Sequence, residues 1–342
     1  MKIALDATYS VGDHLSGVGV YSREMVLGLA QAHPESRFLF CFRPHRFLRA
    51  LRLPVPRNAS RRILIGERPP RPADLFHGLN QRLPRERPRR AVSTFHDLFV
   101  LTGEYSTAEF RKRFAAQARA AAERSDLIIT VSAFTAGQVG QLLGIATERI
   151  RVVPHGVRFP VGGRVAREKI ILHVGAIQKR KNILRLVEAF ENTGADWRLV
   201  LAGSAGYGSE EILGRIAASP RRSDVEVLGY VSGAGLADLY GRASVFAFPS
   251  LDEGFGMPVL EAMASGVPVL TSNRSALPEV AGDAALLVDP VDTEAITSAL
   301  RRLTEDETLR DELIERGLRR AAGFTWEESV RKTWAVYEEL LG

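Results

Sequence analysis

The chain of 342 residues is long enough for two domains of ordinary size, and its hydrophobic content of 45% is typical of soluble globular proteins. It contains no apolar run of about eighteen residues, as a membrane-spanning helix would need, and its strand-like start at Lys2–Asp6 argues against a signal peptide. The single cysteine, Cys41, excludes an internal disulfide and a cysteine-based metal site, so a reducing cytoplasm is the expected compartment.

Charge is divided unevenly along the chain. Residues 1–165 carry 26 Lys and Arg against 13 Asp and Glu, whereas the remainder carries 20 against 27. Most of the excess lies in an arginine-rich stretch between Arg43 and Arg90. A solvated basic surface explains this pattern, and so does attraction to an anionic membrane face or a phosphorylated acceptor. No recognised nucleic-acid-binding module accompanies the arginines, so we expect no nucleic acid partner.

Apolar strands alternate with amphipathic helices throughout, which predicts an α/β fold with parallel sheets. The first half is expected to form strands at 2–7, 37–42, 63–65, 74–77, 91–95, 127–131 and 150–153, with helices at 18–31, 105–124 and 133–143. The Pro- and Gly-rich segment 154–163 then reads as a linker.

A second alternation follows this linker. Its expected strands are 169–174, 197–202, 225–228, 244–248, 267–270 and 285–288, with helices at 182–193, 209–218, 234–241, 257–265 and 292–303. The tail at 306–341 reads as helical. Two doubly wound domains joined near residue 160 fit this pattern, and ligands of such sheets bind beyond the carboxyl ends of the strands.

Two segments of the first half place candidate groups after a predicted strand. Gly17 and Gly19 lie in a loop before a helix, where their amides can approach a phosphate, although a tight turn explains such a loop more readily. His96 and Asp97 end the strand at 91–95. A histidine there points beyond the carboxyl end of the sheet, which makes His96 a candidate functional residue.

Three consecutive cations, Lys179, Arg180 and Lys181, follow the strand at 169–174 and precede a helix. The positive end of the helix dipole disfavours cations at this place, and a bound anion would remove the conflict. Arg offers bidentate hydrogen bonds to a phosphate and Lys offers a point charge. A solvated charge run remains the alternative.

The segment Glu253–Glu261 is the most informative part of the chain. It places two carboxylates eight residues apart, with Gly254, Gly256 and Pro258 between them. A glycine turn that leads into a helix N-terminus is suited to a phosphate, and Pro258 suits the first helical turn. Carboxylates repel a phosphate but accept hydrogen bonds from hydroxyls, so the combination indicates a sugar nucleotide.

Other segments are less informative. The glycine turn at 202–206 is common in form, and Tyr230 and Val231 end a strand where they can line a base pocket, although packing explains them more simply. The chain has no Asp-x-Asp triplet, and its seven histidines show no ligand spacing on one helix. We therefore expect no metal and no cofactor, so Arg180, Lys181 and helix N-termini would meet the charge of a diphosphate.

Together these motifs resemble those of retaining glycosyltransferases of the GT-B fold, specifically glycosyltransferase family 4, the glycosyl transferases group 1. The resemblance covers essentially the whole chain, and the motifs look most like those of bacterial mannosyltransferases of surface polysaccharide assembly. Glu253–Glu261 carries the most specific signature. Further matching segments are Ser16–Gly19, His96–Asp97, Val131–Ser132, Pro154–Val157, Lys179–Asn182, Pro278–Asp283 and Phe324–Trp326.

The resemblance implies a role for each candidate residue. Glu261 would bind the ribose hydroxyls, Glu253 the hydroxyls of the donor sugar, and Arg180 and Lys181 the departing diphosphate. His96 would contact the donor sugar from the N-terminal domain, where the loop of Gly17 and Gly19 would close over the phosphates. The turn between the two carboxylates would line the sugar and the diphosphate. It consists of Gly254, Phe255, Gly256, Met257 and Pro258.

The resemblance also implies the domain arrangement. Residues 1–160 would bind the acceptor, residues 161–326 would bind the nucleotide sugar, and a helix at about 327–342 would return to the N-terminal domain. The chain departs from the family pattern at Ala176, where many relatives have Arg, and at His155, where Asn is common.

The implied reaction transfers a hexose from a nucleoside-diphosphate sugar to a glycan or lipid-diphosphate-linked acceptor, with retention of configuration and without a metal. GDP-mannose is the first candidate donor, and UDP-sugars remain open. We expect the enzyme in the cytoplasm, with contact to the inner face of the cytoplasmic membrane as a further expectation. Two alternatives are a sugar-nucleotide epimerase of the same fold and a non-catalytic scaffold that binds nucleotide sugars.

Overall fold

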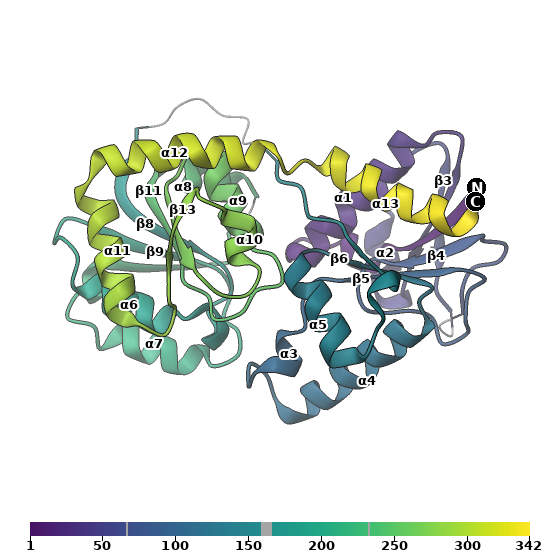
Figure 1. The fold of residues 1–342 in the computed structure, drawn as a ribbon, viewed down its shortest axis with the longest axis horizontal. Helices are drawn as coiled ribbons and strands as arrows, with labels where there is room; N and C mark the ends of the chain where they lie inside the picture. The colour runs from purple at the N-terminus through teal and green to yellow at the C-terminus, as the bar shows by residue number, and fades with distance from the viewer. Residues whose placement is uncertain (66–67, 159–165, 232) are drawn as a thin grey trace. The chain divides into compact units, whose positions relative to one another are not determined.

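The computed structural model describes residues 1–65, 68–158, 166–231 and 233–342 (Figure 1). The chain divides into two compact units, which are described separately. The first comprises Met1–Gly156 and Thr325–Gly342, and the second comprises Val157–Phe324. Part of the linker expected at 154–163 lies outside the described residues, since 159–163 are not among them.

In its described part, the first unit contains a parallel sheet of seven strands in the order β3-β2-β1-β4-β5-β6-β7. Its central strands are buried almost throughout, as is usual where helices cover both faces of a parallel sheet. The strands are β1 (Lys2–Asp6), β2 (Arg37–Phe42), β3 (Ala59–Ile63), β4 (Leu75–Gly78), β5 (Ala91–Phe95), β6 (Leu127–Thr130) and β7 (Ile150–Val152).

Helices α1 and α13 lie on one side of this sheet, and α3, α4 and α5 lie on the other (Figure 1). Hydroxyl side chains fix four of the helix starts, because Ser16, Thr107, Ser132 and Thr325 each accept a hydrogen bond from an amide of the first turn. The helices are α1 (Gly17–Ala32), α2 (Pro44–Ala50), α3 (Phe99–Thr102), α4 (Ala108–Arg124), α5 (Ala133–Leu143) and α13 (Trp326–Leu341).

The C-terminal helix α13 is tied to the first unit by close packing and by a buried polar chain. A Cβ on Gly28 of α1 would lie 2.6 Å from a methyl carbon of α13, so the glycine permits the contact. Tyr337 Oη lies 2.6 Å from His77 Nδ1, and His77 Nε2 lies 2.8 Å from Thr94 Oγ1. Thr94 Oγ1 in turn lies 3.0 Å from Tyr21 Oη, which connects α13 to β4, β5 and α1.

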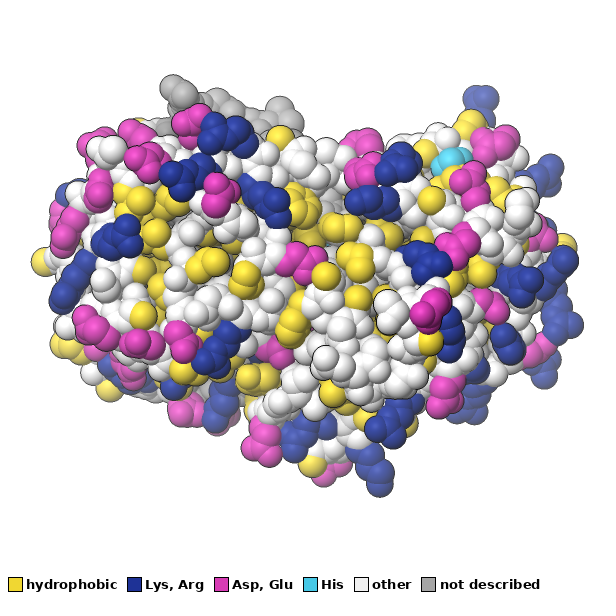
Figure 2. Space-filling model, viewed as in Figure 1, with side chains coloured by type: hydrophobic (Ala, Val, Ile, Leu, Met, Phe, Trp, Pro, Cys, Tyr) yellow, Lys and Arg dark blue, Asp and Glu magenta, His cyan; other side chains and the backbone are white. Residues whose placement is uncertain are grey.

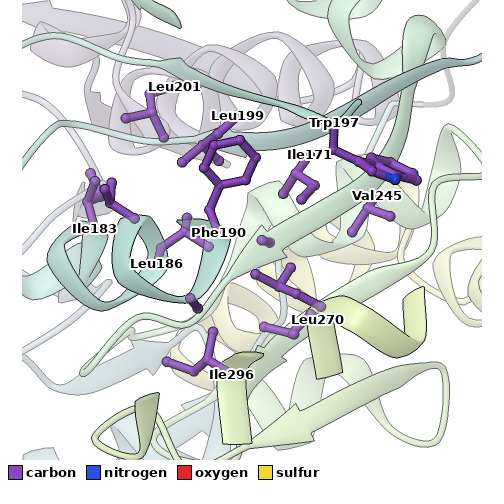
Figure 3. Close-up of a cluster of buried hydrophobic side chains, with 14 of the residues drawn as sticks. Ile171, Ile183, Leu186, Phe190, Trp197, Leu199, Leu201, Val245, Leu270 and Ile296 are labelled. Atoms are coloured by element: carbon purple, nitrogen blue, oxygen red, sulfur yellow. The ribbon is translucent and has the colours of Figure 1, made fainter. Parts of the chain in front are cut away.

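The second unit contains, in its described part, a parallel sheet of six strands in the order β10-β9-β8-β11-β12-β13. Figure 3 shows its core, where apolar side chains of α6 and α11 meet those of the strands around Phe190 and Trp197. The strands are β8 (Glu168–Val174), β9 (Arg198–Ala202), β10 (Val225–Gly229), β11 (Ala243–Phe248), β12 (Val269–Ser272) and β13 (Ala285–Val288). The helices are α6 (Ile183–Glu191), α7 (Ser209–Ala217), α8 (Gly233–Arg242), α9 (Met257–Ala264), α10 (Leu277–Ala281), α11 (Thr293–Glu305) and α12 (Glu307–Ala322).

The structure differs from the predicted elements at one strand, in the tail, and in helices α2, α3 and α10, which were not predicted. Helices α3 and α10 are only four and five residues long, too short to show a helical period. The strand expected at 63–65 is β3 at Ala59–Ile63, because this edge strand is polar and partly exposed and only its end is apolar. Helix α2 was not predicted, since it is short, arginine-rich and buries only Ala50. The tail forms two helices rather than one, and Thr325 caps the second of them.

The order of each sheet creates a switch point, where connections leave in opposite directions from two neighbouring strands. These points lie between β1 and β4 in the first unit and between β8 and β11 in the second. Ligands of open α/β sheets bind outside the carboxyl ends of the strands at such points. We therefore expect functional side chains in the loops after these four strands.

Candidate active site

Two buried cations meet one carboxylate at the switch point of the second unit. Arg180 Nη1 lies 2.8 Å from Glu253 Oε2, and Lys181 Nζ lies 2.6 Å from Glu253 Oε1. None of these three side chains is more than 10% exposed. The cations follow β8 and the carboxylate follows β11, so the structure brings together three residues that the sequence singled out separately.

Backbone contacts fix the turn that carries the cations. The Gly175 amide donates to the Ala202 carbonyl at 2.9 Å, and Ile177 forms a parallel bridge with Ala205. A Cβ on Gly203 would lie 1.8 Å from the Gly175 carbonyl oxygen, so only glycine at 203 permits this approach. These contacts hold the loops after β8 and β9 against each other.

Asn182 ties the same turn to the loop after β11. Its backbone is left-handed, with φ of 57°, a conformation that Asn tolerates better than most residues. Its side-chain amide donates to the carbonyls of Pro249 at 3.0 Å and Pro290 at 2.6 Å. The Leu251 amide also donates to the Arg180 carbonyl at 2.9 Å, so the backbone of the turn with the two cations is bonded to the loop that leads to Glu253. Arg180, Lys181 and Glu253 are called the cation–carboxylate cluster.

Electrostatics keep Glu253 ionised. Burial by itself raises the pKa of Glu253, but Arg180 and Lys181 outweigh that effect and lower this pKa to about 2. Lys181 Nζ also lies 4.5 Å from the ring centroid of Phe248, in a cation–π contact. Buried charges are costly to desolvate, so a cluster of this kind marks a candidate functional site.

Lys179, the first of the three consecutive cations, lies outside this cluster. Its Nζ pairs with Glu211 Oε2 of α7 at 2.8 Å, and its side chain is 47% exposed. The structure thus separates a solvated cation from two buried ones, which the sequence alone does not distinguish.

The glycine turn after Glu253 begins α9. Gly256 has a left-handed φ of 111°, and a Cβ there would lie 2.7 Å from a methyl carbon of α10, so glycine is required on both grounds. Met257 is the first helical residue, and Pro258 occupies the first turn, where its missing amide costs nothing. Gly254 and Phe255 are buried.

Glu261, on the same helix, interacts with Tyr240 of α8. The Tyr240 hydroxyl donates to Glu261 Oε2 at 2.9 Å, and burial raises the pKa of Glu261 despite this bond. Within the described residues, Glu261 Oε1 accepts no hydrogen bond. Glu261 therefore carries an acceptor atom that a ligand hydroxyl can use.

Tyr230 and Val231 lie further along the sheet. They follow β10, and two strands, β9 and β8, separate β10 from β11. Tyr230 is 41% exposed and Val231 is partly buried. The two residues are thus accessible at a strand end, but at the edge of the sheet rather than at its switch point.

The sequence interpretation missed His173 in β8. This buried side chain donates from Nδ1 to the Ala247 carbonyl at 2.9 Å, while Nε2 has no hydrogen-bond partner in the part of the chain that the structure describes. A Cβ on Gly175 would lie 3.5 Å from His173 Nε2 and 3.2 Å from Lys181 Cε, so the histidine lies beside the lysine stem. A histidine within the apolar run from Ile170 to Val174 was the available signal.

In the first unit, His96 is buried and directly follows β5. Its Nε2 donates to the Leu79 carbonyl at 2.9 Å, and its Nδ1 lies 3.4 Å from His155 Nε2. Burial lowers the pKa of His96 to about 4, so the ring is neutral. His155 stacks on His96 with ring centroids 5.3 Å apart, and Tyr21 meets the same ring edge-on at 4.7 Å.

Gly17 and Gly19 form the first turn of α1. Gly17 is exposed, whereas Gly19 is buried and its amide donates to Ser16 Oγ at 3.4 Å. A Cβ on Gly19 would lie 3.0 Å from the Tyr9 carbonyl oxygen, so packing already accounts for this glycine.

Four buried histidines lead to a prediction about pH. Burial lowers the pKa of His77 to about 3, of His96 and His173 to about 4, and of His155 well below its ordinary value. Between these values and about 6.5 the unfolded chain binds protons that the folded chain does not, so stability falls as pH falls. We expect the free energy of unfolding to drop by about 1.4 kcal/mol per pH unit for each histidine, measured by urea titration between pH 7 and 4.

The variant His173→Asn keeps a side-chain amide donor at the position of Nδ1 for the Ala247 carbonyl and removes one titrating group. Its stability should depend less steeply on pH than that of the wild type. Equal slopes for the two proteins, or a wild-type stability that stays constant over this range, would contradict the prediction.

Among the described residues, no group of three or more His, Cys, Asp or Glu side chains is arranged to hold a metal ion. The described helices likewise include none that is both long and apolar enough to cross a bilayer.

Comparison with known proteins covers both units. Residues 158–320 match the family described as glycosyl transferases group 1, and residues 15–159 match glycosyltransferase family 4. The chain is 33% identical over 284 residues to O-antigen chain mannosyltransferase B of Escherichia coli, covering 78% of this chain and 74% of that protein. It is 32% identical to MMP alpha-(1->4)-mannosyltransferase of Mycolicibacterium hassiacum, covering 69% of this chain and 58% of that protein.

Solved structures show the same fold. Sucrose-phosphate synthase from Thermosynechococcus elongatus matches with a TM-score of 0.82 and 22% identity over 99% of both chains. HepE from Anabaena, solved in complex with UDP and glucose, matches with a TM-score of 0.76 and 16% identity over 99% of this chain and 100% of that one. These likenesses confirm the predicted GT-B fold of two parallel-sheet units. By these matches the chain belongs to glycosyltransferase family 4 and is a glycosyltransferase.

Proposed function

We propose that this glycosyltransferase transfers a hexose, with mannose as the first candidate, from a nucleoside-diphosphate sugar to a glycan or lipid-linked acceptor in surface polysaccharide assembly. The observation that carries the proposal is the buried cluster of Arg180, Lys181 and Glu253 beside the start of α9. The names of the mannosyltransferase relatives support the sugar, and the HepE complex with UDP and glucose supports the class of donor.

In this proposal, the donor lies along the carboxyl edge of the second unit. Arg180 and Lys181 hold the diphosphate, and the amides of the turn from Gly254 to Met257 line the sugar and phosphate. Glu253 accepts hydrogen bonds from sugar hydroxyls, which suits a carboxylate whose pKa is about 2. Glu261 Oε1 accepts from the ribose, while Tyr240 holds Oε2.

The proposed reaction retains configuration through attack on the same face from which the leaving group departs. The bond from the anomeric carbon to the phosphate oxygen breaks, and a bond from that carbon to the acceptor oxygen forms. The acceptor proton passes to the departing diphosphate. The protein contributes mainly by stabilising negative charge on the leaving group, and Arg180 and Lys181 supply this without a metal ion.

The first unit is the proposed acceptor side. The bond between His96 Nδ1 and His155 Nε2 is long at 3.4 Å, so His96 can exchange it for a sugar hydroxyl.

Figure 2 shows Lys and Arg side chains gathered at the edge of this unit near β3 and β4, and ten arginines between residues 49 and 90 are exposed. Contact of this edge with an anionic membrane is part of the proposal, and vesicle flotation with and without anionic lipid tests it at moderate salt.

A thermal-shift panel of GDP, UDP and ADP, each with its sugar conjugates, identifies the donor. GDP and GDP-mannose are expected to give the largest shifts. Mass spectrometry of products, with and without an oligomannoside acceptor and with and without EDTA, then tests transfer. Epimerised nucleotide sugar without acceptor would identify an epimerase, and an unchanged donor under every condition would identify a scaffold.

A further inference from the structure

A cavity of about 300 Å³ lies within the first unit, at the carboxyl edge of its sheet. Asp6 at the end of β1, Arg43 and His45 after β2, and Arg82 after β4 contribute polar groups to its lining. The cavity therefore occupies the switch point between β1 and β4, the counterpart of the place where the cation–carboxylate cluster lies in the second unit. Its volume is at the lower end of the range for small-ligand sites.

Asp6 is a buried residue whose carboxylate has one oxygen that accepts hydrogen bonds and one that does not, among the described residues. Only 3% of the residue is exposed. The hydroxyl and the amide of Thr8 both donate to Oδ1, at 2.5 and 3.1 Å. In the described part of the chain, Oδ2 receives no hydrogen bond. Because Asp6 lines the cavity, Oδ2 can accept a hydrogen bond from a donor bound there.

Two guanidinium groups accompany this carboxylate. Arg82 and Arg43 line the cavity and both act electrostatically on Asp6. Arg82 is oriented by its Nε, which donates to Gln117 Oε1 at 2.6 Å. The Arg43 amide donates to Thr8 Oγ1 at 3.2 Å, so its backbone is fixed to the same loop as Asp6. The cavity thus combines charged donors and a charged acceptor within a small volume.

The remaining walls are apolar. Leu64 and Phe76 contribute side chains, together with two prolines. A phosphate would be repelled by Asp6, and an apolar molecule would offer no donor to Asp6 Oδ2 and no acceptor to Arg82. Hydroxyl groups suit the carboxylate and the guanidinium groups alike, because one hydroxyl can donate to the carboxylate and accept from a guanidinium. A pyranose also presents C–H groups to the apolar walls.

We propose that this cavity binds a neutral pyranose unit of the acceptor glycan. Asp6 Oδ2 accepts a hydrogen bond from one sugar hydroxyl, and Arg82 and Arg43 donate to others. This assignment rests on the proposed function and adds to it the chemical class of the acceptor: an uncharged, hydroxyl-rich ring rather than a phosphate.

Two variants test the site from different directions. Asp6→Asn keeps the side-chain volume but removes the charge, and His45→Trp places a bulky ring at the cavity from an exposed position, where folding should be unaffected. Asp74→Asn is the matched control, because this carboxylate accepts from the Lys2 amide at 2.8 Å, at the amino end of the sheet. The readouts are KM for an α-mannobiose acceptor, KM for the donor, and saturation-transfer NMR of methyl α-mannopyranoside without donor.

Both variants should raise the acceptor KM about tenfold or more, Asp6→Asn through loss of one charged hydrogen bond and His45→Trp by filling the cavity, and donor KM should change much less. Both should weaken the NMR signal of the mannoside, and the control should match the wild type. Unchanged acceptor KM in both variants would overturn the proposal, as would displacement of the mannoside by inorganic phosphate. The NMR experiment needs no donor, so it still decides the matter if no nucleotide sugar is turned over and the proposed function itself fails.

Discussion

Replacing Lys181 with Ala is expected to lower kcat by a factor of about 10²–10³, the loss typical of removing one charge-stabilising group from an active site. The reason is position. Lys181 Nζ is buried, lies 2.6 Å from Glu253 Oε1, and occupies the switch point where the proposed diphosphate leaves. Because the charge on the leaving group grows as the bond breaks, losing this cation should affect kcat more than KM for the donor. Steady-state kinetics with the donor that the thermal-shift panel selects measures both constants.

The free energy of unfolding has to be measured as well, because Lys181 is one of the two cations that pair with the buried carboxylate of Glu253. Its removal leaves Glu253 with Arg180 alone, so we expect a loss of about 3 kcal/mol or less in the free energy of unfolding. Lys179→Ala is the matched control, since that neighbouring lysine is 47% exposed and pairs with Glu211 outside the cluster. Near-normal turnover in Lys181→Ala, or an equal loss in Lys179→Ala, would show that the diphosphate site is assigned wrongly.

Much of the fold follows from local patterns. The near-continuous apolar runs of β2 and β11 predict buried parallel strands, and capping residues such as Thr107 and Ser132 fix helix starts. The patterns fail where burial is one-sided or absent. Edge strand β3 has a polar sequence, and α2 buries a single residue, so neither shows the periodicity on which such predictions depend.

For the site, the sequence identifies residue types but not neighbours. Arg180, Lys181 and Glu253 are each recognisable at the end of a strand, yet their meeting depends on β8 pairing with β11, more than 70 residues further along the chain. Local periodicity does not predict long-range pairing of this kind. The same limit hides the difference between Lys179 and Lys181, which are two residues apart and lie in opposite environments.

Asp6 and His173 were missed for a related reason. Both are polar residues that adjoin or interrupt the apolar run of a strand, and a pattern of apolar residues treats them as interruptions. Only the structure shows that each has an atom without a hydrogen bond within the described residues, Asp6 Oδ2 at a cavity and His173 Nε2 beside the lysine stem.

Replacing Glu261 with Ala is expected to weaken binding of the nucleoside diphosphate about 10- to 100-fold, since hydrogen bonds to a charged group contribute about 1.5–3 kcal/mol. In the structure Glu261 Oε2 is held by Tyr240, and Oε1 has no partner among the described residues, which suits it to a ribose hydroxyl. Isothermal titration calorimetry with the nucleotide gives the affinity directly, without turnover.

The 2′-deoxy form of the same nucleotide shows whether the ribose is the partner. Wild-type protein should bind the deoxy form more weakly, and Glu261→Ala should bind the two forms with nearly equal affinity, because the variant no longer contacts the hydroxyl that is missing. Tyr240→Phe serves as the control: it removes the 2.9 Å hydrogen bond but leaves the carboxylate, so discrimination between the two nucleotides should persist. If Glu261→Ala still discriminates as the wild type does, the carboxylate does not bind the 2′-hydroxyl, whatever the loss in overall affinity.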